Sequence, residues 1–378
     1  MKVHNSQRPK DTIGSVGQLN QTLPLSHGEV REIEEITRYH PMAITPHYLN
    51  LISPGDPDDP IRKMAVPSPG EMNLQGSFDT SGEQENTKLQ GLQHKYGQTA
   101  LVLITNQCAM YCRYCFRKRL VGVAGEEIAT DWPAIIDYIE AHEEINNVLL
   151  SGGDALTVST AMLAAILARL VEIPHLSYIR IGSRIPVVQP SRINDDDELV
   201  KILRHYGRRK RIYVTTQFNH PQELARESLQ AVRRLQRAGV VVNNQAVLLK
   251  DVNDDPAVMA ELMVLLTRHG VVPYYIFQCR PVSRVKDAFQ IPLPQASDII
   301  EQVRMRLDGL SKRFRFIMSH KTGKVEILGR DGTQMFFKYH QAKEPNLAGR
   351  LFCKEIRPDQ GWLSSDEDDE EELLPCQE

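Results

Sequence analysis

Six short apolar runs, rich in β-branched residues, alternate with segments of helical periodicity between residues 100 and 309. The apolar runs are 100–105, 147–150, 178–183, 211–216, 240–248 and 273–278. The helical candidates are 131–143, 158–172, 195–206, 221–238, 256–269 and 292–309. Such an alternation is typical of parallel βα units with right-handed crossovers. It therefore predicts an α/β fold, either an open doubly wound sheet or a partial barrel, and periodicity alone does not distinguish the two.

Polar, glycine-rich or proline-rich loops directly follow five of these six runs. The loops are 106–119, 151–156, 183–193, 217–221 and 278–284. Parallel α/β folds bind their ligands at the carboxyl ends of the strands, on the loops that follow them. We therefore expect an active site where these five loops meet.

The first loop carries three cysteines, Cys108, Cys112 and Cys115, in a C-x3-C-x2-C spacing. Thiolates select zinc or iron–sulfur clusters among the common metals. The other three cysteines of the chain are isolated, so no second close pair provides the four ligands of a structural zinc site, although a histidine could complete one. A [4Fe–4S] cluster held by only three cysteines would leave one iron open to an exogenous ligand.

Composition excludes several classes of protein. The chain has 378 residues, of which 41% are hydrophobic and 25% are charged, and its formal net charge is −3. No apolar run approaches the ~18–20 residues of a membrane span, and the N-terminus lacks the apolar core of a signal peptide. Cysteines without a disulfide framework fit a reducing compartment. We expect a cytoplasmic protein with no membrane and no nucleic-acid partner.

The composition also divides the chain into segments. Residues 1–95 are expected to form a mainly helical accessory segment, residues 96–310 the α/β domain, and residues 311–362 a separate C-terminal segment. Residues 363–378 carry eight acidic groups and no basic one. A run of like charges repels itself, so this tail is predicted to be disordered.

Six motifs together resemble the lysine 2,3-aminomutase family, whose members are radical S-adenosylmethionine (SAM) enzymes that also use pyridoxal phosphate (PLP). In the family's order they are ITNQCAMYCRYCFRKRLVG, LLSGGDAL, IRIGSRIPVVQPSRI, TTQFNHPQEL, NNQAVLLKDVND and VPYYIFQCR, over roughly residues 90–330. The resemblance implies a partial (β/α)6 radical SAM barrel and a [4Fe–4S] cluster on the three cysteines. The implied enzyme is an intramolecular aminotransferase, an isomerase that moves the α-amino group of an amino acid to its β-carbon. It also implies an electron donor such as flavodoxin or ferredoxin, and it allows a homo-oligomer.

The resemblance assigns a set of residues to SAM. Tyr114 is placed to pack on the adenine, and the SGGD loop is placed to receive the SAM amino group. Its members are Ser151, Gly152, Gly153 and Asp154. Arg184, Gln189 and Gln217 are further expected contacts, and Gln217 stands where the family often has histidine.

A second set is assigned to PLP and to the substrate. Lys324, preceded by Gly323, is the expected Schiff-base lysine, with Lys321 as its competitor. Lys95 and Tyr96 match residues that bind the PLP phosphate, while Thr99 replaces an arginine of the family pattern. Arg117 matches the arginine that binds the substrate α-carboxylate.

Two positions depart from the pattern of lysine-specific members, which hold the distal ammonium with two aspartates. Arg280 and Ile317 stand at those positions. An arginine 4 Å from an ammonium would repel it by about 4 kcal/mol with an effective dielectric constant near 20, whereas it suits a carboxylate. We therefore expect glutamate or another non-lysine substrate. The alternatives are lysine, free or on a translation factor, and a PLP-free radical SAM or iron–sulfur redox or binding protein.

Overall fold

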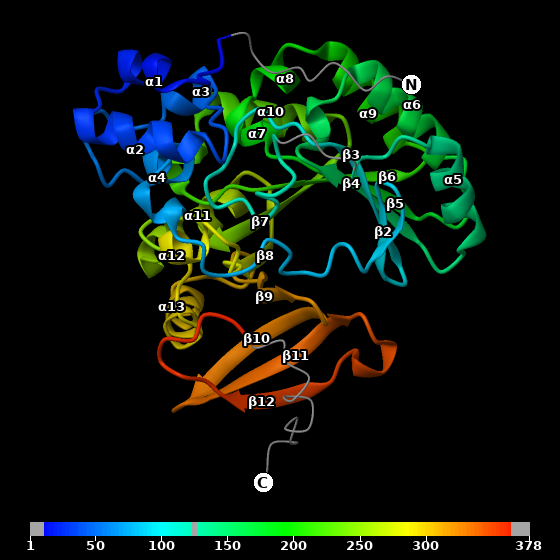
Figure 1. The fold of residues 1–378 in the computed structure, drawn as a ribbon. Helices are drawn as coiled ribbons and strands as arrows, with labels where there is room; N and C mark the ends of the chain where they lie inside the picture. The colour runs from blue at the N-terminus through cyan, green and yellow to red at the C-terminus, as the bar shows by residue number, and fades with distance from the viewer. Residues whose placement is uncertain (1–10, 123–126, 364–378) are drawn as a thin grey trace.

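The structure is a computed structural model that describes residues 11–122 and 127–363. In it, twelve strands form one continuous sheet in which each strand lies beside the next one along the chain (Figure 1). The strands are β1 (Thr87–Leu89), β2 (Leu92–Tyr96), β3 (Thr99–Thr105), β4 (Asn147–Gly152), β5 (Tyr178–Gly182), β6 (Arg211–Thr216), β7 (Val241–Leu248), β8 (Val272–Gln278), β9 (Arg315–His320), β10 (Gly323–Asp331), β11 (Gln334–Ala342) and β12 (Leu351–Glu355). The predicted acidic tail lies outside the described residues except for Leu363.

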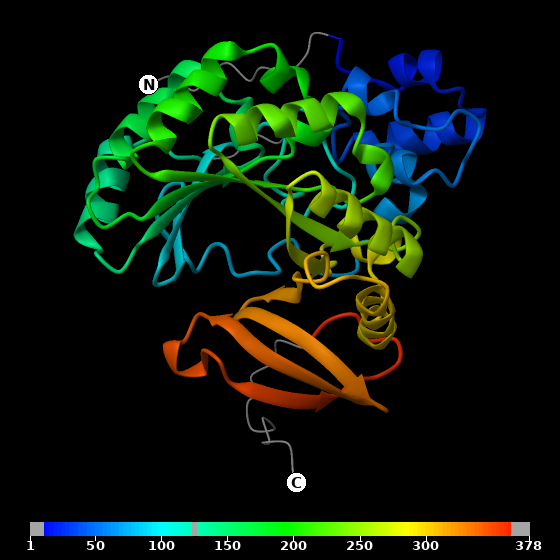
Figure 2. The same cartoon turned by 180° about the vertical axis from the view of Figure 1, so that it is seen from behind.

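The middle of the sheet is a partial βα barrel. Strands β3 to β9 are parallel, and helices cover their outer face (Figure 2). The helices of this layer are α5 (Trp132–Ala141), α6 (Thr160–Leu170), α7 (Ile185–Val188), α8 (Ser191–Asn194), α9 (Asp197–Gly207), α10 (Arg226–Arg237), α11 (Pro256–Arg268), α12 (Lys286–Phe289) and α13 (Leu293–Met305). All six predicted strands and all six predicted helices are present, and the barrel alternative is confirmed.

Aspartates at the helix N-termini explain several of these boundaries. Asp131, Asp196 and Asp255 each accept a hydrogen bond from a backbone N–H in the first turn of the helix that follows. Such caps satisfy amide groups that have no partner inside the helix. A proline in the first turn of α5 and α11 adds a fixed backbone angle suited to that position.

Alternation along the strands leaves the barrel interior partly hollow. In β5, Ile179 and Ile181 are fully buried under the helices, while Arg180 and Gly182 face the interior and line a cavity. Strand β7 alternates in the same way over its whole length. Because successive side chains of a strand point to opposite faces, one set of residues builds the outer core and the other set surrounds the cavity.

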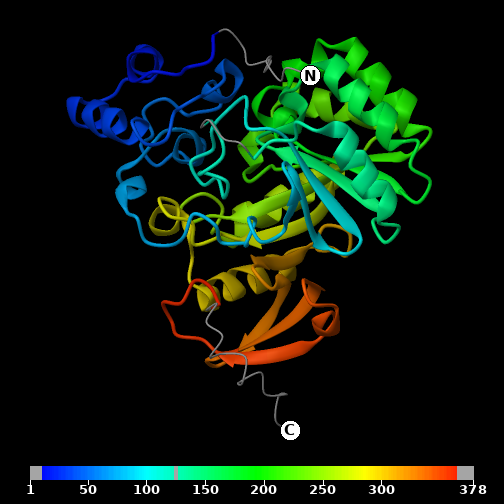
Figure 3. The same cartoon turned by 45° about the vertical axis from the view of Figure 1, so that its right-hand side comes forward.

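Two further layers close this arrangement. Helices α1 (Val16–Thr22), α2 (His27–Thr37), α3 (Pro46–Leu49) and α4 (Pro60–Ala65) lie together on one side of the barrel (Figure 1). At the other end, β9 pairs with β8 in parallel and with β10 antiparallel, so that β10, β11 and β12 extend the sheet as an antiparallel layer with α13 against it (Figure 3).

The segment boundaries at 95 and 310 stay predictions, but the sheet runs across both regions. Residue 95 falls inside β2, which forms an antiparallel hairpin with β3 of the barrel. The accessory segment is helical up to Ala65 and then contributes strands β1 and β2. Within the described residues, no helix is long and apolar enough to cross a bilayer.

Candidate active site

One cavity of about 360 Å³ lies inside the barrel. It is lined by fifteen of the residues that the sequence assigned to the cluster, SAM, PLP or the substrate. They are Lys95, Tyr96, Cys108, Cys112, Tyr114, Cys115, Arg117, Ser151, Gly152, Gly153, Asp154, Arg184, Gln217, Arg280 and Lys324. Three other residues considered from the sequence, Gln189, Lys321 and Ile317, are not among the lining residues. The predicted convergence of loops therefore occurs in the fold.

The three cysteines follow β3 on a loop at the carboxyl end of the barrel. The amide of Cys115 donates to the carbonyl of Cys112 at 3.2 Å, which forms a tight turn between them. Burial, and then the charge of Cys112, raise the pKa of the Cys115 thiol to about 11. In the described part of the chain, no three His, Cys, Asp or Glu side chains are grouped as a ready metal site. The donor set nevertheless fits an iron–sulfur cluster, because all three sulfur donors border one cavity and thiolates are the ligands such clusters use.

Gly152 and Gly153 hold this loop by close backbone contact. A Cβ atom on Gly152 would lie 2.1 Å from the Thr105 carbonyl oxygen, and one on Gly153 would lie 2.3 Å from the Gln107 carbonyl oxygen. The Gly153 amide donates to Thr105 O at 2.6 Å. Gly152 also has φ +116°, a conformation that favours glycine. The glycines therefore let the end of β4 pack on the base of the cysteine loop.

Asp154 has its carboxylate satisfied by the protein. It accepts hydrogen bonds from Ser183 Oγ at 2.6 Å, the Arg184 amide at 2.6 Å and the Leu156 amide at 3.0 Å. Burial raises the pKa of this carboxyl, and those hydrogen bonds oppose the rise. Asp154 thus ties the β4 loop to the β5 loop, and its predicted role toward the SAM amino group stays a prediction.

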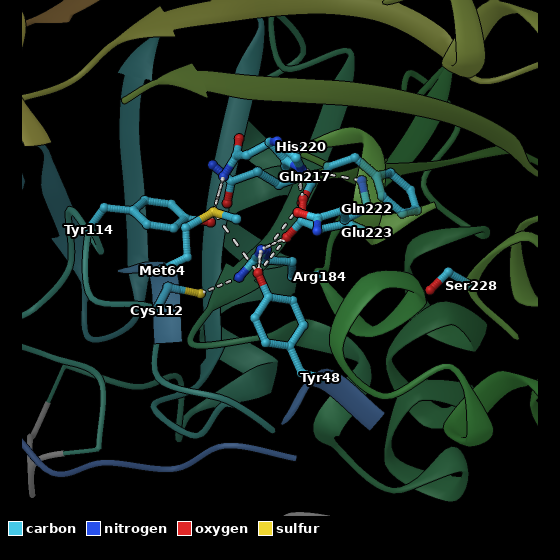
Figure 4. A network of polar contacts seen from close by, with 12 residues as sticks. Tyr48, Met64, Cys112, Tyr114, Arg184, Gln217, His220, Gln222, Glu223 and Ser228 are labelled. Carbon is cyan, nitrogen blue, oxygen red and sulfur yellow. Dashed lines mark hydrogen bonds and ion pairs between the residues drawn. The ribbon is translucent and has the colours of Figure 1, made fainter. Parts of the chain in front are cut away.

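Arg184 stands at the centre of a buried polar network at the cluster side of the cavity (Figure 4). Its Nη1 donates to Cys112 Sγ at 2.8 Å and its Nε to the Gln217 carbonyl at 3.1 Å. Its Nη2 forms an ion pair with Glu223 and donates to Tyr48 Oη at 3.1 Å. Buried charges require this kind of full pairing.

Glu223 and Tyr48, which sequence reasoning did not single out, complete this network. Tyr48 donates to Glu223 Oε1 at 2.6 Å, and the other carboxylate oxygen accepts from the Asn219 and His220 amides. Asn219 in turn donates to the Tyr114 hydroxyl at 2.7 Å. Glu223 lies inside the TTQFNHPQEL motif, two residues beyond the loop expected to be functional, so its only sequence signal was its place in that motif.

Arg117 is also paired, with a carboxylate from the accessory segment. Its Nε donates to Glu83 Oε1 at 3.0 Å, and its Nη1 donates to Ser151 Oγ at 3.0 Å. Arg119 donates to the other oxygen of Glu83 at 2.8 Å. Although burial raises the pKa of Glu83, Arg117, Arg280 and Arg119 outweigh burial and hold this pKa below its ordinary value. Glu83 is a cavity residue that the sequence did not reveal.

The opposite side of the cavity contains Lys324, at the start of β10. Its Nζ lies 5.2 Å from the ring centre of Tyr275 and 5.6 Å from that of Tyr96. Burial, followed by Arg180, Arg280 and Lys95, lowers the pKa of Lys324 to about 7. A Cβ on Gly323 would lie 2.2 Å from the Gln341 carbonyl oxygen, which explains a glycine directly before this lysine. Lys321, the competitor, is exposed and outside the cavity.

Arg280 has hydroxyl partners instead of a carboxylate. It donates to Ser81 Oγ at 2.9 Å and to Ser319 Oγ at 2.8 Å, and it lies 4.4 Å from the ring centre of Phe116. Ile317 is fully buried in β9, and the cavity residue of that strand is Ser319, two positions further on. Ile317 therefore does not face the cavity, and Ser319 is the residue of β9 that lines it.

Lys95 donates to the carbonyls of Ser81 and His320, at 3.2 and 2.8 Å. Burial, then Arg280 and Lys343, lower its pKa to about 7. Arg180, a further cavity residue, comes from β5 and adds another positive charge on this side. Among the lining residues, the only carboxylates are Glu83 and Asp154, and both are already engaged.

Comparisons with known proteins agree with this site. A model of the radical SAM superfamily matches residues 102–263. The chain is 41% identical over 303 residues to the L-lysine 2,3-aminomutase of Clostridium subterminale. The matched region covers 79% of this chain and 71% of the relative. It is 38% identical over 304 residues to the glutamate 2,3-aminomutase of Clostridioides difficile, with 79% and 70% covered.

A solved radical SAM methyltransferase from Sphaerobacter thermophilus is 17% identical, with a TM-score of 0.38 over 60% of this chain and 68% of that one. That likeness is too distant to add to the argument. The identity to the aminomutases, over more than two thirds of each, is sufficient: the chain belongs to the lysine 2,3-aminomutase family of radical SAM enzymes.

Proposed function

We propose that this chain is a radical SAM, PLP-dependent 2,3-aminomutase whose substrate is an acidic amino acid, with glutamate as the first candidate. The cluster and SAM supply a radical that takes hydrogen from an unactivated carbon, and PLP supplies a carrier for the migrating nitrogen. Cys108, Cys112 and Cys115 would hold the cluster and Lys324 would hold PLP. We place the enzyme in the cytoplasm, with a flavodoxin or ferredoxin as its electron donor.

The observation that carries the substrate class is the charge of the cavity around Arg280. This guanidinium is partly buried and forms no ion pair with a carboxylate among the described residues, although the charge of Glu83 acts on it. Glu83 is held by Arg117 and Arg119, so it is not available to a distal ammonium. A side-chain carboxylate on the substrate would satisfy Arg280 with charge-assisted hydrogen bonds, whereas the side chain of lysine would meet repulsion.

The environments of Lys324 and Arg117 support their roles. A lysine with a pKa of about 7 is largely a neutral amine near physiological pH, which is the form that attacks an aldehyde. Arg117 lies between the cluster loop and the β4 loop, where its guanidinium also contacts Ser151. We assign Arg117 to the substrate α-carboxylate, which would share this guanidinium with Glu83.

The substrate is tested with anaerobically purified protein reconstituted with iron, sulfide, SAM, PLP and a reductant. Glutamate and lysine are offered separately, and the 3-amino isomers are quantified by mass spectrometry. We expect β-glutamate from the wild-type protein and a loss of ~10- to 100-fold in kcat/KM in Arg280→Gln, because one charged hydrogen-bonding partner is removed. Faster formation of β-lysine than of β-glutamate would refute the charge argument.

The lysine assignment has its own test. After reduction with borohydride, PLP attached to the protein is located by peptide mass spectrometry. We expect the label on Lys324 and its disappearance in Lys324→Met, whereas Lys321→Met, which changes an exposed neighbour, keeps it. A label on Lys321, or none in the wild-type protein, would overturn the role of Lys324.

A further inference from the structure

Arg180 is a cavity residue that has no role in the function proposed above. It projects from the middle of β5 into the barrel, opposite in direction to Ile179 and Ile181, which are fully buried under the helices. A guanidinium in the interior of a barrel strand is costly unless it has partners. Its presence there therefore calls for a ligand or an ion pair.

The protein itself provides little for this guanidinium. Its hydrogen bond to Thr99 Oγ1 is 3.5 Å long, and its buried Nε has no hydrogen-bond partner within the described residues. No carboxylate of the described chain forms an ion pair with it, and its charge, together with burial, lowers the pKa of Lys324 by repelling the protonated form of that lysine. A side chain held this weakly can turn toward an anion that enters the cavity.

The position of Arg180 differs from that of Arg280. Arg280 stacks on Phe116, next to Cys115, and donates to Ser319, the strand partner of Lys324, so it lies between the cluster loop and Lys324. Arg180 instead approaches Thr99, at the start of β3, far from the cysteine loop along that strand. Thr99 is fixed there, because its hydroxyl oxygen also accepts from Asn147 Nδ2 at 3.1 Å. The cavity thus offers two separate guanidiniums for two separate anions.

We propose that Arg180, together with the hydroxyl of Thr99, binds the phosphate of PLP. This inference rests on the proposed function, since it needs the aldehyde end of the cofactor at Lys324. A dianionic phosphate matches the planar fork of an arginine, and it would also offset the mutual repulsion of Lys95, Arg180 and Lys324. Thr99 stands where an arginine was expected from the sequence, and Arg180 supplies a guanidinium to the same place from β5.

The test compares two ligands that differ only in the phosphate. Reconstituted protein freed of PLP is titrated with PLP and with pyridoxal, and the dissociation constants are measured by absorbance. In Arg180→Gln we expect the Kd for PLP to rise by ~10- to 100-fold, the range that corresponds to one hydrogen bond to a charged group, while the Kd for pyridoxal stays the same. Inorganic phosphate should compete with PLP in the wild-type protein and lose that ability in the variant.

Two further variants keep the result interpretable. Thr99→Val removes only the hydroxyl and should raise the Kd for PLP by a few-fold without affecting pyridoxal. Arg209→Gln, on an exposed ion pair with Glu172, should change neither constant. Circular dichroism and iron content confirm that each variant is folded.

The results that would refute the phosphate assignment differ from those that would refute the proposed function. An equal rise of both constants in Arg180→Gln would mean that Arg180 supports the ring or the fold and would overturn the phosphate assignment, as would an unchanged Kd for PLP. A wild-type protein that takes up neither PLP nor pyridoxal would overturn the proposed PLP-dependent function itself, before any variant is compared.

Discussion

At the cluster end of the cavity the arginines are paired with carboxylates of the chain, whereas at the Lys324 end they are not. Arg184 is paired with Glu223, and Arg117 is paired with Glu83, in both cases out of contact with most solvent. At the other end the cations are Lys95, Arg180, Arg280 and Lys324, whose described partners are carbonyls, hydroxyls and aromatic rings.

The two ends of the cavity therefore differ in whether their charges are balanced before a ligand binds. The cluster end is balanced in charge before a ligand arrives, so its side chains are already in place and little ordering remains to be done. When its lysines are protonated, the Lys324 end has an excess of positive charge, which anionic ligands would balance. A phosphate and a substrate carboxylate are the two anions that we assign to it, and the protein folds with their places open.

The largest effect of a substitution at one fixed pH that this comparison predicts is on the paired side. Glu223→Ala removes the carboxylate of the buried Arg184 and leaves an uncompensated charge, so we expect the free energy of unfolding to fall by ~3–5 kcal/mol. Urea denaturation under anaerobic conditions measures it. Glu172→Ala, which breaks the exposed pair with Arg209, serves as the control and should have no measurable effect. Similar stability of the two variants would contradict a preassembled cluster end.

The parts of this structure that follow local rules were predictable from the sequence. The strands and helices of the barrel lie within a few residues of the predicted ones, because each is marked by its own periodicity and by turn residues. The cysteine loop and the glycines of the β4 loop are also local motifs, so their meeting in one cavity followed from the parallel topology.

Residues whose roles depend on distant partners were not predictable in this way. Glu83 lies in the predicted accessory segment, where no motif marks it, and its partner Arg117 is 34 residues further along the chain. Glu223 and Tyr48 are 175 residues apart. Arg180 did have a signal, since an arginine in the middle of the apolar run YIRIG faces the barrel interior whenever its neighbours face the helices.

The second effect concerns the unpaired side and depends on pH. Lys95 and Lys324 have pKa values of about 7 in the folded protein, against ~10.4 for an unperturbed lysine. Between these values the unfolded chain binds more protons than the folded one, so the stability of the ligand-free protein should rise with pH from about 7 to 10.5. Each lysine contributes ~1.4 kcal/mol per pH unit.

The variant Lys324→Met isolates one of these two contributions. The difference in unfolding free energy between wild type and Lys324→Met should therefore change with pH across that window and be constant below it. Lys321→Met, at an exposed position, should run parallel to the wild type. A difference between wild type and Lys324→Met that stays constant between pH 7 and 10 would show that the lysine keeps its proton in the folded state.

The smallest effect is expected at a cation that forms no ion pair with a carboxylate. In ligand-free Arg280→Gln, the hydrogen bonds to Ser81 and Ser319, the contact with Phe116 and the attraction of Glu83 are lost, but so is the repulsion of Arg117, Lys95 and Lys324. These contributions oppose each other, so the free energy of unfolding should change by less than about 1 kcal/mol, in the range of ordinary substitutions. Urea denaturation beside Glu223→Ala gives the direct contrast. If Arg280→Gln lowered the free energy of unfolding as much as Glu223→Ala, then Arg280 would stabilise the fold in the way that the paired arginines do. The two ends of the cavity would then not differ in their charge pairing, and Arg280 would no longer indicate an anionic substrate.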